Sequence, residues 1–154
     1  MKKVILVLLA LIAVNVSNAQ ELRINEVDDF TGDVKKFSNY YNVAKTEVGL
    51  IKVSTVRINS SYFMKVISTF DLGCSGVTGN YIIVMFADGT RVEIRKDHSD
   101  IDCSEGSASL FVVKDGSPLF TKEITKIRFK QSEYYTDGVT AGTYSLAQLF
   151  TAVK

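Results

Sequence analysis

The chain is poor in the residues that mark common catalytic and metal-binding sites. It has two cysteines, one histidine, one proline and no tryptophan in 154 residues. The sequence contains neither His-Glu-x-x-His nor a paired Cys-x-x-Cys, so neither common zinc pattern is available. Asp97, His98 and Ser99 are triad residue types, but adjacent residues do not converge on one point as a triad must. We therefore expect no cofactor, no bound metal and no enzymatic activity.

The chain also lacks an excess of charge of either sign. It has 18 basic and 17 acidic residues, and removal of Lys2 and Lys3 with a leader would leave 16 against 17. This near balance gives no electrostatic footprint for nucleic acid or for an anionic membrane. There is no low-complexity segment, linker or fixed-period repeat, which favours a single domain.

The first 19 residues have the pattern of a secretory signal peptide. Lys2 and Lys3 precede an apolar run over residues 4–14, and Ser17 and Ala19 place small residues before a cleavage point at Gln20. The alternative is a membrane anchor, but the run is shorter than the roughly 20 residues that a membrane span needs. We expect a signal peptide over 1–19 and a single β-rich domain over 20–154. The domain would be exported, to the periplasm, the cell surface or the medium, with no membrane span after cleavage.

Alternating apolar and polar residues predict strands along most of the mature chain. The predicted strands lie at 22–27, at 50–58 and 62–70 as one hairpin, at 81–87 and 91–95 as a second, and at 110–113, 124–129 and 134–139. A turn is expected at 29–33, and the last strand is expected to break near Asp137 and Gly138. Residues 36–45 carry apolar side chains at no clean period, and we leave their structure open.

The chain ends in one predicted helix. Ser145 and Gln148 have the spacing of a capping box, and Leu146, Leu149, Phe150 and Val153 form one apolar stripe. A helix this short is marginal alone, so it must pack on a sheet face. The sequence therefore predicts a mainly β fold, an antiparallel β-sandwich or bent sheet with a short C-terminal α-helix.

The hairpin around Asp88 and Gly89 suggests a role for the two cysteines. A two-residue type I′ turn at these positions pairs residues whose numbers add up to 177, and Cys74 and Cys103 also add up to 177. The register continued outward would bring the two sulfur atoms opposite one another, within reach of a disulfide. Because export favours oxidised cysteines, we predict a Cys74–Cys103 disulfide. The alternative is two buried free thiols.

Candidate binding residues are few. Tyr40 with Tyr41, and Tyr134 with Tyr135, are candidate partner-binding aromatics, and in each pair we expect one ring in the core and one exposed, because neighbours on a strand point to opposite faces. The acidic loop over residues 97–105 offers oxygen ligands for Ca²⁺ from Asp100, Asp102 and Ser104, but its spacing is not that of an EF-hand. A plain acidic loop is the alternative.

Several segments together resemble small exported proteins of Bacteroidota-type bacteria. They are residues 18–20, Asn-Ala-Gln; 23–28, Arg-Ile-Asn-Glu-Val-Asp; 30–32, Phe-Thr-Gly; 86–90, Phe-Ala-Asp-Gly-Thr; Cys103; 124–128, Ile-Thr-Lys-Ile-Arg; and the terminal helix. This resemblance implies an exported β-rich domain. It implies no activity, and it carries no functional residue over to this chain.

Three functions follow as hypotheses. The first is a non-enzymatic domain that binds or scaffolds another envelope or extracellular protein through sheet edges and aromatic side chains. The second is a small secreted hydrolase, which would bring two carboxylates together in a cleft about 5–10 Å apart. The third is a carrier of Ca²⁺ or a small ligand on the 97–105 loop.

Overall fold

A computed structural model describes residues 22–72, 80–95, 107–131, 134–142 and 145–154. The elements formed by these residues are β1 (Leu22–Val27), β2 (Val34–Ser38), β3 (Tyr41–Lys45), β4 (Leu50–Ile58), β5 (Ser61–Ser68), β6 (Tyr81–Phe86), β7 (Arg91–Arg95), β8 (Ser107–Val113), the 3₁₀ helix η1 (Pro118–Phe120), β9 (Ile124–Gln131), β10 (Tyr134–Thr140) and α2 (Leu146–Val153). Within these ranges no helix has the length and apolar character needed to cross a membrane.

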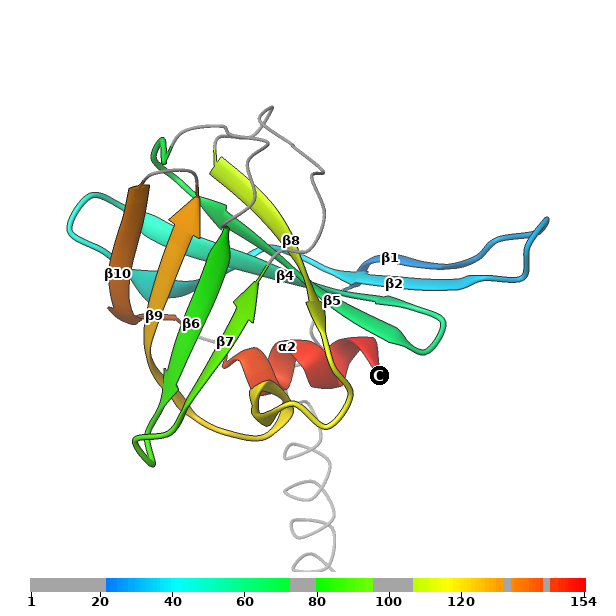
Figure 1. Cartoon of the computed structure of the whole chain (residues 1–154). Helices are drawn as coiled ribbons and strands as arrows, with labels where there is room; N and C mark the ends of the chain where they lie inside the picture. Colours follow the sequence, from blue (N-terminus) through cyan, green and yellow to red (C-terminus); the bar gives the residue numbers. More distant parts are fainter. Residues whose placement is uncertain (1–21, 73–79, 96–106, 132–133, 143–144) are drawn as a thin grey trace, which may run out of the picture.

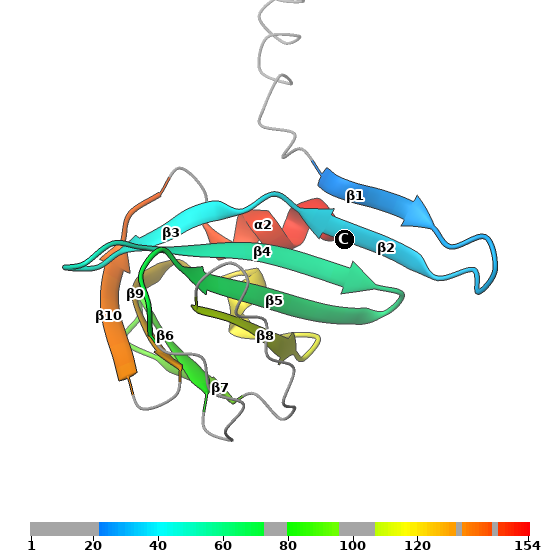
Figure 2. The ribbon, with the colours of Figure 1, turned by 90° about the horizontal axis from the view of Figure 1, so that it is seen from above.

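The strands form one antiparallel sheet. Its main path runs β1-β2-β4-β3-β10-β9-β6-β7, while β5 pairs with β4 and β8 pairs with β5. Figures 1 and 2 show that the sheet curves, so that β6, β7, β9 and β10 stand opposite β4, β5 and β8. The predicted class, mainly β and antiparallel with one short C-terminal helix, is confirmed.

The hydrophobic core lies between the two halves of the curved sheet. Alternate residues of each strand point into it, as the two-residue period of a strand requires. The fully buried side chains come from both halves: Val53, Met64, Val66 and Phe111 from one, and Ile82, Val84, Ile127 and Phe129 from the other. Burying one such side chain stabilises the fold by roughly 1.5–3 kcal/mol.

Helix α2 covers one end of this core, as Figure 1 shows. Its four predicted stripe residues are all buried, and the predicted capping box is present: the Gln148 N–H donates to Ser145 Oγ, and the Ser145 N–H donates to Gln148 Oε1. Thr55 Oγ1 of β4 donates a buried hydrogen bond of 2.8 Å to the Leu149 carbonyl. At the end of the helix, Arg57 Nη1 of β4 also donates to the Lys154 carbonyl. The helix is therefore tied to the sheet by apolar packing and by polar contacts with β4.

Residues 36–45, whose structure the sequence left open, belong to two strands on the same edge of β4. Phe37 of β2 pairs with Val56, and Tyr41 of β3 pairs with Val53. The interruption at Asn39 and Tyr40 breaks the alternation of the side chains. This break explains why no single period was visible in the sequence.

The hairpin of β6 and β7 differs from the prediction by one residue. The paired residue numbers add up to 176, as in Val84 with Val92, and Met85 faces Arg91. The loop has three residues, since the Phe86 N–H donates to the Thr90 carbonyl and the Gly89 N–H donates to the Phe86 carbonyl. Gly89 has φ +79°, whereas Asp88 does not have the positive φ that a type I′ turn requires.

Local hydrogen bonds to the Asp88 side chain explain this loop. The Thr90 N–H and the Thr90 hydroxyl both donate to Asp88 Oδ1, and Lys122 Nζ lies 2.5 Å from Oδ2. Such local hydrogen bonds between an aspartate side chain and the nearby backbone stabilise a turn around the aspartate. The corrected register removes the numerical match that supported the Cys74–Cys103 disulfide. Both cysteines lie outside the described residues, and so does the predicted signal peptide.

The predicted break in the last strand is also wrong, because β10 runs unbroken through Asp137 and Gly138. Gly138 lies close to the end of β3. A Cβ at this position would lie 2.9 Å from Ala44 Cβ and 3.1 Å from the Lys45 carbonyl oxygen. The glycine therefore permits a close contact between two strands and does not mark a break.

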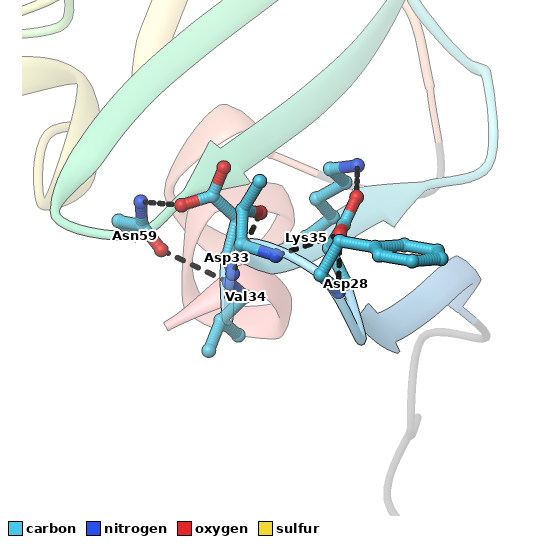
Figure 3. A network of polar contacts seen from close by, with 7 residues as sticks. Asp28, Asp33, Val34, Lys35 and Asn59 are labelled. Atoms are coloured by element: carbon cyan, nitrogen blue, oxygen red, sulfur yellow. Dashed lines mark hydrogen bonds and ion pairs between the residues drawn. The ribbon is translucent and has the colours of Figure 1, made fainter.

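The hairpin of β1 and β2, which we call the arm, projects from the sheet (Figures 1 and 2). The predicted turn at 29–33 is confirmed, with Gly32 at φ +75° and its N–H donating to the Asp28 carbonyl. Figure 3 shows how Asn59, from the β4–β5 turn, holds the base of this turn. Its side chain accepts from the Val34 N–H at 2.9 Å and donates to Asp33 Oδ1 at 2.7 Å.

The turn of the arm contains a carboxylate with a displaced pKa. Hydrogen bonds from Lys35 first, and then from the Thr31 and Phe30 N–H groups, lower the pKa of Asp28 from 3.8 to about 2. Because the folded pKa lies below the unfolded one, these contacts stabilise the fold above about pH 4, and the contribution is lost as the pH falls through about 2.

We expect a carbon-13 NMR titration of the Asp28 carboxyl group to give a pKa of about 2. In the Lys35→Met variant the same titration should give a higher value, because the largest cause of the shift is removed. A pKa near 3.8 in the parent protein would contradict the contacts seen at this turn.

Candidate functional site

The four predicted aromatics do not divide into one core ring and one exposed ring per pair. Tyr40 and Tyr41 are both half-buried. Tyr134 and Tyr135 are both exposed, at 64% and 58%. The expectation is wrong for Tyr134 because β3 pairs only with Val139 and Thr140, which leaves the first half of β10 as an open edge. Tyr135 points to the outer face of the sheet, beside basic side chains of β9.

The outward side chains of β10, β9, β6 and β7 form a surface that we call the cation–tyrosine face. Strand pairing aligns them in three rows across the four strands. The rows are Tyr135–Lys130–Tyr81–Arg95, Asp137–Arg128–Ile83–Glu93 and Val139–Lys126–Met85–Arg91. The sheet topology thus gathers five basic side chains that are up to 39 positions apart in the sequence.

This face carries an excess of positive charge. Of its seven charged side chains, five are basic and two are acidic. Both acidic groups are paired: Asp137 accepts two hydrogen bonds of 2.6 Å from Arg128, and Glu93 lies 2.5 Å from Arg95. Across the described residues, Arg91, Lys126 and Lys130 have no carboxylate within salt-bridge distance. Three positive charges are therefore available to an anionic ligand.

Two tyrosine rings hold three of the cations in place. The Arg128 guanidinium lies 4.7 Å from the Tyr135 ring centre, and Lys130 and Arg95 each lie 5.7 Å from the Tyr81 ring centre. Such cation–π contacts are worth about 0.5–1 kcal/mol at exposed sites. The cations are partly ordered before any ligand arrives, which reduces the entropy lost on binding.

The Arg128–Asp137 pair stays charged over the physiological pH range. The hydrogen bond and charge of Arg128 lower the pKa of Asp137, and the same contact raises the pKa of Arg128 above its already high value. A bidentate pair of this kind also fixes the orientation of the guanidinium plane. Asp137 therefore serves to position Arg128 and is unsuited to act as a proton donor.

A hollow of about 650 Å³ lies at the end of the cation–tyrosine face that is formed by the Val139–Lys126–Met85–Arg91 row. Ile83, Met85 and Val139 line it, and Met85 and Val139 are 40% and 56% exposed. The charged side chains around them are mostly basic: Lys45, Arg91, Lys126 and Arg128 against Glu47 and Asp137. An apolar depression with a basic rim suits a ligand that has both apolar and acidic groups.

The remaining predicted sites have different outcomes. His98, Cys74, Cys103 and the 97–105 loop lie outside the described residues, so the disulfide and calcium predictions stay predictions. Within the described ranges, no group of three or more His, Cys, Asp or Glu side chains is placed to hold a metal ion.

The hydrolase hypothesis has one relevant observation. Glu47 and Asp137 line the same hollow. Glycoside hydrolysis needs one carboxylic acid with a raised pKa. The pKa of Asp137 is instead lowered by Arg128, so Asp137 is unsuited to be that acid.

The basic residues of the face were missed as a group by sequence reasoning. The alternation of Arg91, Glu93 and Arg95, and of Lys126 and Arg128, does place them on outward faces. Nothing in the sequence shows that β6 lies between β7 and β9, and this placement is what joins the two sets.

Comparison of the chain with protein-family models, with curated proteins and with solved structures gives no match.

Proposed function

We propose that this protein is a non-enzymatic binding domain that contacts another protein through its cation–tyrosine face. The observation that carries the proposal is the set of aligned rows on that face, which place basic side chains beside a hollow with partly exposed apolar side chains. The signal-like leader supports an exported setting, where the partner is an envelope or extracellular protein.

The partner segment is acidic. The face has three more basic than acidic side chains, although the mature chain as a whole is nearly neutral. A local excess of this kind favours the encounter with an acidic surface and excludes basic ones. Arg91, Lys126 and Lys130 supply the contacts, because the other two cations already have carboxylate partners.

The partner segment also carries an apolar side chain. Ile83, Met85 and Val139 offer partly exposed apolar surface in the hollow of this face. Burying this surface contributes roughly 25 cal/mol per Å². A protein segment supplies both kinds of group. A sugar would stack on open tyrosine rings, but here cations occupy a side of the Tyr81 and Tyr135 rings.

A binding titration with matched variants tests the proposal. The probe is a short fluorescent peptide in which glutamates flank a leucine–phenylalanine pair, followed by anisotropy at low salt. We expect a Kd on the order of 10–100 μM, as for a small interface. The double variant Arg91→Glu, Lys126→Glu should weaken binding by about 100-fold, because it reverses two charges at the contact.

The control variant is Lys36→Glu, Lys52→Glu. It makes the same change in net charge but lies away from the cation–tyrosine face, on β2 and β4. We expect it to change the Kd less than about threefold at moderate salt. Equal losses of affinity in the two double variants would show that binding depends on net charge alone, which would contradict the proposal. Equal binding of a peptide with glutamine in place of glutamate would also contradict it, and binding of a polyuronate in place of the peptide would identify the ligand as an acidic glycan.

A further inference from the structure

We propose that the arm mediates self-association, with Phe30 of one copy inserting into an apolar groove of a second copy. The proposal concerns a different surface from the cation–tyrosine face and does not depend on the proposed function. It rests on the rigid presentation of Phe30, on a groove of suitable size, and on opposite charges at the two places.

The side chain of Phe30 is exposed to solvent at the tip of the arm. It is 101% exposed, and Val27 beside the turn is 59% exposed. The turn does not need an aromatic residue, because its shape is set by Gly32 and by the Asp28 carboxylate, which accepts from the Phe30 and Thr31 N–H groups at 3.0 Å. A phenyl ring exposed in this way is available as an anchor for a pocket on another molecule.

A groove that fits a phenyl ring lies on the outer face of β2, β4, β5 and β8. It has a volume of about 310 Å³, and its apolar lining includes Phe37, Val56, Ile58, Phe63 and Leu110. Phe37 pairs with Val56, and Val56 pairs with Phe63, so one apolar row crosses three strands. This continuous apolar surface supplies the floor on which a ring can pack.

The groove and the tip have opposite charges. Arg23 and Lys65 line the groove, and both lie over the Tyr40 ring, at 5.2 and 5.9 Å from its centre. The tip of the arm carries Asp28, Asp29 and Asp33 within six residues, and since Lys35 pairs with Asp28, the groove meets the charges of Asp29 and Asp33. This complementarity favours the arm tip of a second copy as the occupant of the groove, and the acidic tip disfavours contact with an anionic lipid surface.

The groove cannot be filled by the tip of its own chain. Phe30 is seven residues beyond Arg23 along the arm, which places it roughly 20 Å away at about 3.3 Å per residue. The arm projects away from the body in Figures 1 and 2. Two arms laid antiparallel about a two-fold axis carry each tip to the groove of the other copy, so the association closes as a dimer.

Sedimentation velocity of the purified protein over a range of concentrations tests this inference. We expect a monomer–dimer equilibrium with a Kd on the order of 10–100 μM. Phe30→Ala should raise the Kd by at least about tenfold, because it removes the anchor. The matched control is Val48→Ala, which removes another exposed apolar side chain from a different loop and should leave the Kd unchanged.

A charge exchange tests the pairing of tip and groove. Lys65→Glu alone and Asp29→Lys alone should each weaken the dimer, and the double variant should restore most of the parent affinity, because each tip then meets a groove of opposite charge again. Thermal melting of each variant checks that its fold is intact. The double variant also separates a specific contact from damage by either single change.

Three results would overturn the inference. They are a parent protein that stays monomeric at millimolar concentration, a Phe30→Ala variant that associates like the parent, and a double variant no better than the singles. Binding to phosphatidylcholine–phosphatidylglycerol vesicles that depends on Phe30, without dimers, would assign the tip to a lipid surface and would also overturn it.

Discussion

Replacing Phe150 by alanine is expected to lower the free energy of unfolding by about 3–5 kcal/mol, as for other buried phenylalanines. Phe150 is completely buried where α2 meets the sheet and η1. Its ring centre lies 4.6 Å from that of Phe120 and 6.5 Å from that of Tyr62. Truncation leaves a cavity between the helix, η1 and β5. Urea unfolding followed by far-UV circular dichroism measures the change.

Thr151→Ala is the matched control for this prediction. Thr151 is the next residue of the same helix and is exposed, and its hydroxyl donates to the Ala147 carbonyl. We expect a change within about 0.5 kcal/mol. A loss below 1 kcal/mol in Phe150→Ala would mean that the helix does not close the core.

The second large effect is expected at Phe111 and Phe129, where the two halves of the curved sheet meet. Phe111 of β8 and Phe129 of β9 are fully buried, and their rings meet edge to face with centres 6.3 Å apart. No hydrogen-bonded pairing joins β8 to β9. Alanine at either position should cost about 3–5 kcal/mol, and the double-mutant cycle should show a coupling of about 0.5–1.5 kcal/mol.

The control for this cycle is Val112→Ala. Val112 follows Phe111 on the same strand but points outward and is 52% exposed. We expect it to cost less than about 1 kcal/mol. Additive losses at Phe111 and Phe129 would show that the two halves do not pack through these rings.

The elements of the fold were largely predictable because each has a local signal. The helix from Leu146 to Val153 has both its cap and its apolar stripe in the sequence, and both are present in the structure. The hairpin of β4 and β5 has two alternating runs around a turn signal at Asn59, which has φ 55°. These features depend on residues that are close together in the sequence, so the sequence pattern alone predicts them.

The incorrect predictions concern places where side-chain contacts or distant strands determine the backbone conformation. Asp-Gly permits a type I′ turn, but contacts from Thr90 and Lys122 to Asp88 favour a three-residue loop, and Lys122 is 34 residues away. Gly138 looked like a strand break because its reason, the close approach of Ala44 and Lys45, lies on another strand. No local pattern reports such contacts.

The candidate site was less predictable than the fold. Sequence reasoning selected tyrosine pairs, and of those four only Tyr135 lies on the cation–tyrosine face. Tyr81 and the basic residues were not selected, because their importance comes from the order β10-β9-β6-β7. The net charge also concealed the patch, since acidic residues elsewhere balance it, including those at the tip of the arm.

The most direct test of the cation–tyrosine face is a map of backbone amide shifts in a heteronuclear NMR titration with the glutamate-flanked peptide. The account predicts that the largest changes fall on β6, β7, β9 and β10, around Met85, Lys126 and Val139, and that they disappear in Arg91→Glu, Lys126→Glu. Changes centred on another face, or no change at millimolar peptide, would contradict the account.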